Sequence, residues 1–428
     1  MSQSDDLTQR IAFQLYNLSW RIALPWLRRN HRLAEGYRQR TLKINLPAAD
    51  LWIQAASVGE SYLALEIIKT LRLTTAIKIL LTSNTRQGVD ILQELSTDHE
   101  VHDGQLQVSV GYFPFDKPTI MQKAIDNIRP GAMVLLETEI WPGLLRALKE
   151  YKCKILIVNG RLTEKSLKRY LLWPALWQQL SPDRVMAISP NDADRFRRLF
   201  GHDRIEVMPN IKFDRIASAT GSNRDQTTIK AIVPGDNPFV VLASVRRPEE
   251  PLVKKIIHKV LSSRPETVIG LFPRHMHRIQ YWHESLSRMG IRNSLRSKTK
   301  EQVAAGTVVV WDTFGELLPA YRLAESAFVG GSLAPLGGQN FLEALISGII
   351  PIIGPWWDNF SWVGPEITES GLLRVAGDWE QVADLLLKDL ASAPSRNDVI
   401  NAAVQFIEAR RGGTDRACRR IVACLESK

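Results

Sequence analysis

The sequence predicts an α/β protein in which an N-terminal amphipathic helix precedes two doubly wound, Rossmann-like domains that face a central cleft. Three observations lead to this fold class. The chain has 428 residues, enough for two or three domains with cores of their own. Short apolar runs alternate with helical stretches, which is typical of βαβ units around a parallel sheet. A polar segment containing Gly, Ser, Asn and Pro, at 216–238, divides these runs into two series and is a candidate linker.

The N-terminal segment 1–45 is expected to associate with a membrane. Residues 7–40 are expected to be mostly helical, with Pro25 as a kink point. Apolar residues recur every three or four positions along a face flanked by arginines, and they include Ile11, Leu15, Leu18, Ile22 and Trp26. This pattern suits a helix lying in an anionic leaflet, although a helix docked on its own domain is the alternative. No apolar run is long enough to span a bilayer, and the early charges Asp5, Asp6 and Arg10 make a poor signal peptide, so the chain is expected to be neither exported nor integral.

The first domain is expected over 46–215. Its strand candidates fall at 51–56, 77–83, 108–113, 132–137, 154–159 and 184–189. Open parallel sheets bind ligands at the carboxyl ends of their strands. The polar residues that follow these strands are therefore the first candidates for a site.

Two acidic motifs follow strands of this domain. Ser57 and Glu60, with Gly59 between them, have the spacing of a capping box that opens a helix. The alternative is that Glu60 projects into the cleft as a general base, in which case burial would raise its pKa and the helix N-terminus would favour its anion. Glu137 and Glu139 follow another strand, where alternate positions point to one side, so both are expected to face the cleft unless they only begin a capped helix.

Arginines follow three further strands. Arg161 comes after the strand at 154–159 and is suited to holding a phosphate or carboxylate, although a surface turn is the alternative. The second domain is expected over 239–428, with a C-terminal helix at 399–425. Arg246 and Arg274 follow its first two strands and offer cations to an anionic donor, or else belong to a solvated basic face. The strand candidates of this domain are 239–244, 267–272, 307–311, 326–330 and 349–353.

Paired glycines follow the strand at 326–330. Gly331 and Ser332 lie in the first glycine motif, and two more glycines precede Gln339 and Asn340. Glycines let the backbone approach a phosphate, and the next helix offers free N–H groups. Glu343, one turn into that helix, is placed to accept hydrogen bonds from a ribose, or else to serve as the capping partner of Asn340. The spacing is neither G-x-G-x-x-G nor a Walker loop, which weakens the dinucleotide and NTPase alternatives.

Composition narrows the class of protein. Hydrophobic residues make up 45% and charged residues 23%, which excludes a disordered or fibrous chain. The net charge of +10 indicates anionic partners: nucleic acid, phosphorylated small molecules or a membrane surface. The three cysteines exclude a disulfide scaffold, no Cys/His cluster has zinc-ligand spacing, and a reducing cytoplasmic compartment fits best.

Taken together and in this order, these motifs resemble the 3-deoxy-D-manno-octulosonic acid (Kdo) transferases, a family of GT-B glycosyltransferases. The resemblance runs from about residue 33 to 379. Its marks are Ala56-Ser57-Val58-Gly59-Glu60, Glu137-Thr138-Glu139-Ile140-Trp141-Pro142, Asn159-Gly160-Arg161-Leu162, Lys212-Phe213-Asp214, Asp312-Thr313-Phe314-Gly315-Glu316-Leu317, and Gly330-Gly331-Ser332-Leu333 with Gly337-Gly338-Gln339-Asn340.

The resemblance implies inverting transfer of Kdo from CMP-Kdo to a phosphorylated lipid A precursor, at the cytoplasmic face of the bacterial inner membrane. It makes Glu60 the base that deprotonates the acceptor. Arg274, Gly331, Ser332 and Asn340 would surround the CMP phosphate, and Glu343 would hold the ribose. No cofactor and no metal are expected. Donor, acceptor and membrane are then all anionic, which gives the positive charge one shared explanation.

The chain departs from the family pattern at four places. The family usually has His at Gln339, Pro at Ala344 and Asn at Gly143, and a His expected after the strand at 239–244 is replaced by Arg246 or Arg247. Gln donates a hydrogen bond but cannot become a cation as His can, whereas Arg adds a fixed charge. These changes are compatible with a divergent orthologue, a different sugar donor or a weakened paralogue.

Two other functions are compatible with the sequence. One is a different nucleotide-sugar enzyme on the same fold, such as an epimerase, which gives no reason for the basic amphipathic helix. The other is a non-catalytic protein that binds nucleic acid or anionic lipid. Against nucleic acid as a partner, basic residues are spread over the chain and no recognition motif is present.

Overall fold

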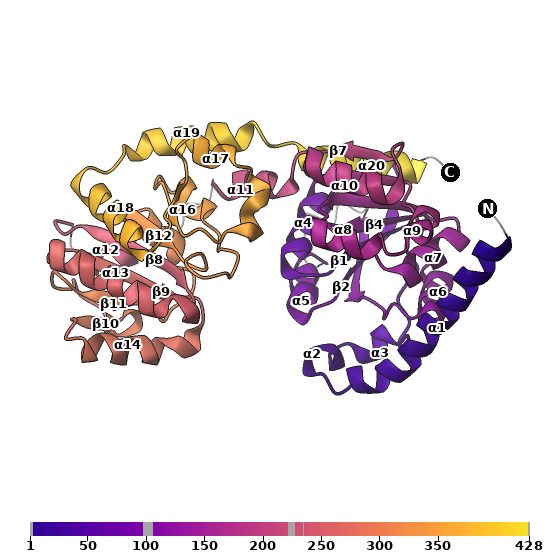
Figure 1. Cartoon of the computed structure of the whole chain (residues 1–428), viewed down its shortest axis with the longest axis horizontal. Coiled ribbons are helices and arrows are strands. Elements are labelled where there is room, and N and C mark those ends of the chain that lie inside the picture. The colour runs from indigo at the N-terminus through magenta and orange to yellow at the C-terminus, as the bar shows by residue number, and fades with distance from the viewer. Residues whose placement is uncertain (1–2, 97–105, 221–226, 234, 427–428) are drawn as a thin grey trace. The chain divides into compact units, whose positions relative to one another are not determined.

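Two seven-stranded parallel sheets organise the chain in this computed structural model, which describes residues 3–96, 106–220, 227–233 and 235–426. Each sheet forms the centre of one compact unit. Unit 1 consists of Met1–Arg215 and Arg410–Lys428, and unit 2 of Ile216–Ala409. Figure 1 shows helices packed around both sheets, which confirms the predicted α/β architecture of two doubly wound domains.

The sheet of unit 1 has the strand order β3-β2-β1-β4-β5-β6-β7. Its central strands β1 and β4 are buried at every position, as expected where helices cover both faces of a parallel sheet. The strands are β1 (Leu51–Ala55), β2 (Ile77–Ser83), β3 (Leu106–Tyr112), β4 (Ala132–Leu136), β5 (Lys154–Gly160), β6 (Arg184–Ala187) and β7 (Ile205–Val207).

Alternate side chains of these strands enter two separate cores. Trp52 and Met133 pack on one face with helices α6, α7, α9 and α10, whereas Ile53 and Val134 pack on the other with α4 and α20. The helices of unit 1 are α1 (Gln3–Leu27), α2 (His31–Ala34), α3 (Tyr37–Arg40), α4 (Val58–Thr70), α5 (Arg86–Ser96), α6 (Pro118–Ile128), α7 (Pro142–Glu150), α8 (Glu164–Tyr170), α9 (Pro174–Gln179), α10 (Pro190–Phe200) and α20 (Gly413–Glu426), and α11 (Ile211–Thr220) leads into unit 2.

The sheet of unit 2 has the order β10-β11-β9-β8-β12-β13-β14. The strands are β8 (Phe239–Val245), β9 (Val268–Pro273), β10 (Asn293–Leu295), β11 (Val308–Val310), β12 (Ser326–Val329), β13 (Ile352–Ile353) and β14 (Arg374–Val375). The α-helices are α12 (Thr227–Lys230), α13 (Glu250–Ser263), α14 (Ile279–Arg288), α15 (Leu317–Tyr321), α16 (Leu342–Ile346), α17 (Glu366–Glu369), α18 (Trp379–Ala391) and α19 (Arg396–Glu408).

The C-terminal helix belongs to unit 1, which corrects the predicted second domain of 239–428. Asp214 accepts hydrogen bonds from the backbone N–H groups of Gly412 and Thr414, each at 2.7 Å, and so anchors the start of α20. The apolar face of α20 then enters the core beside α4, where Ala417 and Ile421 are fully buried. The single helix predicted over 399–425 is divided into α19 (Arg396–Glu408), which belongs to unit 2, and α20, so periodicity identified helical sequence but neither the break nor the domain that buries the second part.

The segment expected to be a linker, 216–238, falls within unit 2. It contains the short helix α12, and Ile229 and Ile232 are buried. Much of the polar stretch that suggested a linker, 221–226 and Pro234, lies outside the described residues.

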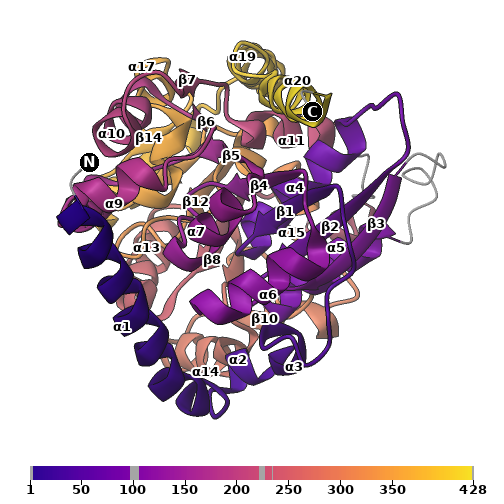
Figure 2. The same ribbon diagram turned by 90° about the vertical axis from the view of Figure 1, so that its right-hand side faces the viewer.

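Helix α1 runs along one side of unit 1 beside α6 (Figure 2). Phe13 is buried, and the Tyr16 hydroxyl donates a 2.9 Å hydrogen bond to Asp116, so the helix is docked on its own domain. It continues through Pro25 to Leu27, and the predicted long helix is divided into α1, α2 and α3. The described helices include none that is both long and apolar enough to cross a bilayer.

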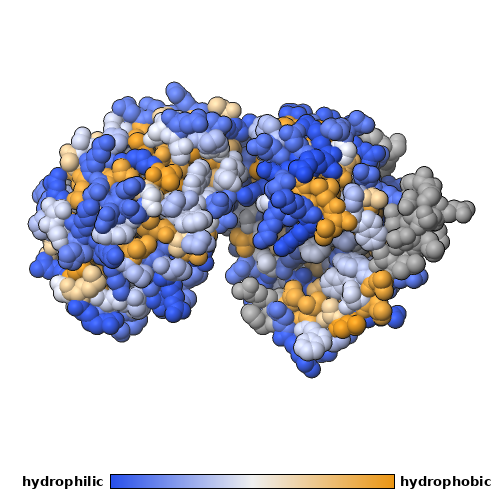
Figure 3. All heavy atoms as spheres, viewed as in Figure 1, coloured by the Kyte–Doolittle hydropathy of each residue, from blue (hydrophilic) through white to orange (hydrophobic). Residues whose placement is uncertain are grey.

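The outer side of α1 nevertheless carries exposed apolar side chains. Four of them, spaced three or four residues apart, are each more than half exposed: Leu15, Leu18, Ile22 and Trp26. Figure 3 shows hydrophobic residues gathered at this part of unit 1. Docking therefore uses one side of the helix and leaves an apolar row on the other.

Candidate functional site

Glu60 lies in the first turn of α4, directly after β1, and is only 8% exposed. One carboxylate oxygen accepts from the backbone N–H of Ala56 at 2.6 Å, and the other accepts from the Ser57 hydroxyl at 2.9 Å. The Ser57 oxygen in turn accepts from the Glu60 N–H at 3.4 Å. Ser57 therefore N-caps α4 as predicted, but the Glu60 carboxylate reaches back to the N–H of Ala56 and not to that of Ser57 as in a complete capping box. These bonds fix the carboxylate at the carboxyl edge of the sheet, where Ser57 and Gly59 are exposed.

Burial raises the pKa of Glu60 from 4.5 to about 8. The negative charges of Glu139 and Glu137 raise this pKa further, whereas the hydrogen bonds from Ala56 and Ser57 lower it. Of the two opposing influences considered for this residue, burial outweighs the helix N-terminus. A carboxyl group with a pKa near neutral pH is suited to accept a proton in a reaction at that pH.

Glu137 and Glu139 flank Thr138 in the loop after β4, rather than lying in the strand as the alternation argument required. Glu137 has a φ of 54°, in the left-handed region, and its carboxylate lies 2.6 Å from the Lys212 ammonium. Glu139 accepts a 2.7 Å hydrogen bond from the Trp141 indole. Burial raises the pKa of Glu139, and the charge of Glu137 raises it further. The two carboxylates act electrostatically on Glu60 because of the loop conformation, not because of strand periodicity.

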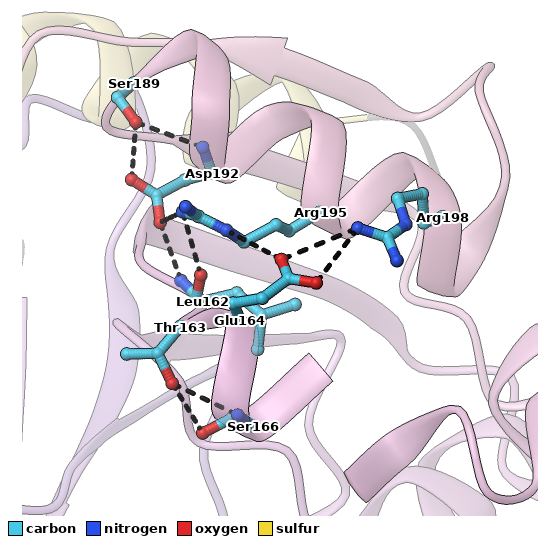
Figure 4. A network of polar contacts seen from close by, with 8 residues as sticks. All are labelled: Leu162, Thr163, Glu164, Ser166, Ser189, Asp192, Arg195 and Arg198. Carbon is cyan, nitrogen blue, oxygen red and sulfur yellow. Dashed lines mark hydrogen bonds and ion pairs between the residues drawn. The ribbon is translucent and has the colours of Figure 1, made fainter. Parts of the chain in front are cut away.

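Arg161 follows β5 on a loop held by helix α10 (Figure 4). Ser189 N-caps α10 by accepting from the Asp192 N–H at 3.0 Å, and its hydroxyl donates to one oxygen of the Asp192 carboxylate. The other oxygen of that carboxylate accepts from the Leu162 N–H at 2.9 Å. Arg195 donates to the Leu162 carbonyl at 3.2 Å. The network extends from Glu164 to Arg195 and Arg198.

The carbonyl of Arg161 also accepts from the Thr138 hydroxyl. This bond ties the loop after β5 to the acidic loop after β4. The half-buried Arg161 side chain is therefore based at the same sheet edge as Glu137 and Glu139, as predicted from their positions after neighbouring strands.

The glycine motif of unit 2 surrounds a buried carboxylate of the protein itself. Glu249 is fully buried, and its oxygens accept from the backbone N–H groups of Gly331 at 2.6 Å and of Ser332 and Leu333 at 2.8 Å. The N–H of Arg246 donates to the same carboxylate at 3.2 Å. These amides were expected to face a phosphate, and the structure corrects that expectation because they are already bonded.

Ser332 is also corrected as a ligand contact. Its side chain is fully buried, donates to the Val329 carbonyl at 2.7 Å and accepts from the Gly354 N–H at 2.8 Å. It therefore holds the loop together. Gln339 is half-buried, and its amide donates to the Gly338 carbonyl at 3.0 Å.

Asn340 and Glu343 lie at the start of α16 and are not fully buried. Asn340 is exposed and donates to the Glu343 carboxylate at 2.8 Å, while its own oxygen accepts from the Leu342 N–H at 3.2 Å. The capping alternative is therefore realised here as well, and it orients Glu343 at the edge of the sheet after β12 without burying it.

A cluster of cations lies at the carboxyl ends of β8 and β9. Arg274 is exposed, and its N–H donates to the carbonyl of Val245 at 2.9 Å, so the two strand ends are joined. The pKa of His275 is lowered by burial first and then by nearby positive charges, which include Arg246 and Arg274. These side chains are the groups at this edge best suited to an anion.

Metal-binding groups are not found in the ranges that the structure describes: no three His, Cys, Asp or Glu residues there are grouped so that they could hold an ion.

Sequence reasoning missed two residues that organise these edges. Glu249 was passed over because nothing in Arg246-Arg247-Pro248-Glu249 marks it as buried. Lys212 was quoted only within a motif, yet it supplies the cation for Glu137. Hydrophobic periodicity does not reveal a buried charge in a short loop after a strand. The Pro248-Glu249 step before a helical stretch was nevertheless a usable signal for a helix start.

Comparison with known proteins gives a consistent result. Residues 27–215 match the sequence family described as 3-deoxy-D-manno-octulosonic-acid transferase (kdotransferase). The 3-deoxy-D-manno-octulosonic acid transferase of Bordetella pertussis is 30% identical over 375 residues, 86% of each chain. That of Haemophilus influenzae is 27% identical over 397 residues, 91% of this chain and 90% of the other.

Among solved structures, a glycosyltransferase from Rickettsia africae superposes with a TM-score of 0.58 at 12% identity, covering 88% of this chain and 99% of that one. At this level of identity the likeness concerns the fold alone, and it agrees with the GT-B class.

Proposed function

Since the chain belongs to the 3-deoxy-D-manno-octulosonic acid transferase family and is a glycosyltransferase, we propose that it moves Kdo from CMP-Kdo to a phosphorylated lipid A precursor with inversion at the anomeric carbon. The observation that carries the proposal is the buried carboxylate of Glu60, held at the carboxyl edge of β1 with a pKa of about 8. Family membership favours a Kdo transferase over the epimerase, whereas a non-catalytic paralogue would belong to the same family and is distinguished by the assay below.

Glu60 is the catalytic base in this proposal. An acceptor hydroxyl gives its proton to the Glu60 carboxylate while its oxygen forms a bond to the anomeric carbon of Kdo. The bond between that carbon and the CMP phosphate oxygen breaks, and CMP leaves with the electron pair. One displacement of this kind inverts the configuration and needs neither a covalent enzyme intermediate nor a metal.

The remaining residues of unit 1 serve the acceptor. Ser57 and the Ala56 N–H hold the base in place. Glu137 and Glu139 keep its pKa high, and Lys212 limits that effect by neutralising Glu137. Arg161 is assigned to an anionic group of the acceptor, such as a phosphate, because a guanidinium binds phosphate oxygens bidentately.

The residues of unit 2 serve the donor. Arg246 and Arg274 are assigned to the CMP phosphate, and Glu343, oriented by Asn340, to the ribose hydroxyls. A carboxylate held in place by a capping partner is a suitable hydrogen-bond acceptor for two vicinal hydroxyls.

Helix α1 is assigned to the cytoplasmic face of the inner membrane. Its apolar row of Leu15, Leu18, Ile22 and Trp26 is exposed, and the guanidinium of Arg29 lies 5.8 Å from the Trp26 ring. An apolar row beside cations binds anionic lipid from the interface without crossing the bilayer.

The test is incubation of the full chain with CMP-Kdo and a lipid A precursor, followed by mass analysis of the lipid. Addition of Kdo is the expected result, and it should be absent with Glu60→Gln while CMP still binds. Glu150→Gln, which changes an exposed carboxylate of α7 paired with Arg146 on the same helix, serves as the control and should remain active. Normal turnover by Glu60→Gln would remove Glu60 as the base, and an unmodified lipid with the wild-type protein would reject the acceptor or the donor.

A further inference from the structure

We propose that Glu249 is a positioning residue that fills the amide pocket of the glycine loop from inside the protein, so that arginine side chains and not the loop amides hold the donor phosphate. The inference deepens the proposed function and depends on it for the identity of the donor. It starts from one observation: the N–H groups at residues 331, 332 and 333 all point at a carboxylate of the same chain.

The contacts of Glu249 join two neighbouring strands. One oxygen accepts from Gly331 at 2.6 Å and from Arg246 at 3.2 Å, and the other accepts from Ser332 and Leu333 at 2.8 Å. Arg246 follows β8 and Gly331 follows β12, and these strands pair directly (Figure 1). Glu249 is fully buried, so the carboxylate is surrounded by donors and shielded from water. A buried carboxylate with four N–H donors is well satisfied as an anion.

The same carboxylate explains why glycines occupy the motif. A Cβ on Gly330 would lie 3.1 Å from the Glu249 carboxylate and 3.0 Å from the Val245 backbone. Gly331 has a φ of 71°, which glycine adopts without strain. The carboxylate and the Val245 backbone leave little room for a side chain at Gly330, and the left-handed φ together with the Gln339 side chain, 2.9 Å from an added Cβ, accounts for Gly331, so the protein itself explains both glycines.

A phosphate entering this pocket would meet the negative charge of Glu249 in place of free amides. The nearest suitable groups are the side chains at the ends of β8 and β9. Arg246 has its backbone N–H fixed by Glu249, and Arg274 is joined to the same strand end through the Val245 carbonyl. Glu249 thus sets the positions of both the loop and one of the two arginines.

Hydrogen exchange tests the hold of Glu249 on the loop without any variant. The amides at 331–333 should exchange slowly in the wild-type protein before any nucleotide is added. Exchange that is fast without CMP and becomes slow only when CMP is added would show a phosphate cradle and overturn the proposal. This arm is independent of turnover, so it decides the role of Glu249 in the loop even if the donor assigned above is wrong.

The variant Glu249→Gln tests the link to the donor by calorimetry with CMP and by steady-state kinetics with CMP-Kdo. The nitrogen of the new side-chain amide would then face backbone N–H donors, so the loop should be held less firmly. We expect at least tenfold weaker CMP binding and faster hydrogen exchange at 331–333. The KM for CMP-Kdo should rise, with a smaller change in kcat. Unchanged CMP affinity would overturn the proposal. Tighter CMP binding would also overturn it, because Glu249 would then be competing with the phosphate for the amides.

Asp389→Asn is the matched control for loss of a buried carboxylate. Asp389 is 3% exposed, pairs with Arg374, and accepts from Ser326 at the first residue of β12, so it lies at the opposite end of that strand. We expect lowered thermal stability with unchanged CMP affinity. If Asp389→Asn weakens CMP binding as much as Glu249→Gln does, the effect is general destabilisation and the positioning role is rejected.

Discussion

The raised pKa of Glu60 predicts that stability and activity depend on pH in opposite directions. The unfolded chain releases this proton near pH 4.5, whereas the folded chain retains it up to about pH 8. Between these values the folded state binds more protons, so its stability falls as the pH rises. Activity should rise over the same range, because the base must be ionised before it can accept a proton.

The size of both effects follows from the two pKa values. With the pKa at about 8, roughly one tenth of Glu60 is ionised at pH 7. The ionisable side chain then costs about 3 kcal/mol of folding free energy at pH 7 and about 5 kcal/mol at pH 9, relative to a neutral group at the same position. Glu60→Gln should remove this cost, so its stability relative to the wild type should increase with pH by these amounts.

Two assays check the prediction. Urea unfolding of wild type and Glu60→Gln from pH 4 to pH 9 gives the stability difference, in which the shifts of other buried carboxyls largely cancel. The pH profile of kcat/KM for the wild type should rise about tenfold per pH unit and level off near pH 8. A midpoint near pH 5, together with a stability difference that does not change with pH, would refute the reasoning about burial.

Three further predictions concern other positions. Gly143→Ala would place a Cβ 2.6 Å from the Asp116 carbonyl, so we expect the free energy of unfolding to fall by about 1–3 kcal/mol. An unchanged melting temperature in thermal unfolding would contradict this packing. Lys212→Met leaves Glu137 without the cation at 2.6 Å, so the midpoint of the pH profile of kcat/KM should move upward. Lys212→Arg should restore the midpoint. A midpoint that does not move in Lys212→Met would rule out this coupling. Glu343→Ala should weaken CMP binding about tenfold by calorimetry, a loss of about 1.4 kcal/mol, and equal affinity would argue against the ribose role.

The architecture of two parallel sheets could be predicted from the sequence because each strand is marked by its own residues. The central strands at 51–55 and 132–136 are near-continuous apolar runs, which is how a parallel sheet covered on both faces appears in a sequence. The edge strands β7, β10 and β14 were missed because each contains polar residues, whereas the equally short β11 and β13 lie in apolar runs and were predicted. The place of α20 was missed because it depends on the bonds of Asp214 to a segment about 200 residues away.

Part of the candidate site could also be predicted from the sequence, because its residues directly follow strands. Position after a strand identified Glu60, Glu137 and Arg161, since the carboxyl ends of parallel strands meet at one edge. The function of the glycine motif was misjudged because its amides are equally suited to an external phosphate and to an internal carboxylate. Only the burial of Glu249 separates the two, and burial depends on how the whole of unit 2 packs.

Backbone strain gives independent support for the importance of these strand ends. Glu137, Asn159 and Ser244 all have φ between 52° and 57°, and each lies at or just after the carboxyl end of a strand, β4, β5 or β8. The register is also irregular where β5 and β8 end. A left-handed conformation costs a residue with a side chain about 1–2 kcal/mol, so it persists only where the surrounding structure requires it. Glu137 lies just beyond the end of β4 with a left-handed φ, so strand alternation does not set the direction of its side chain, and periodicity gave the wrong reason for its effect on Glu60. Three of the six non-glycine residues with positive φ among the described residues thus lie at these strand ends, and one of them, Glu137, carries a carboxylate that acts on Glu60.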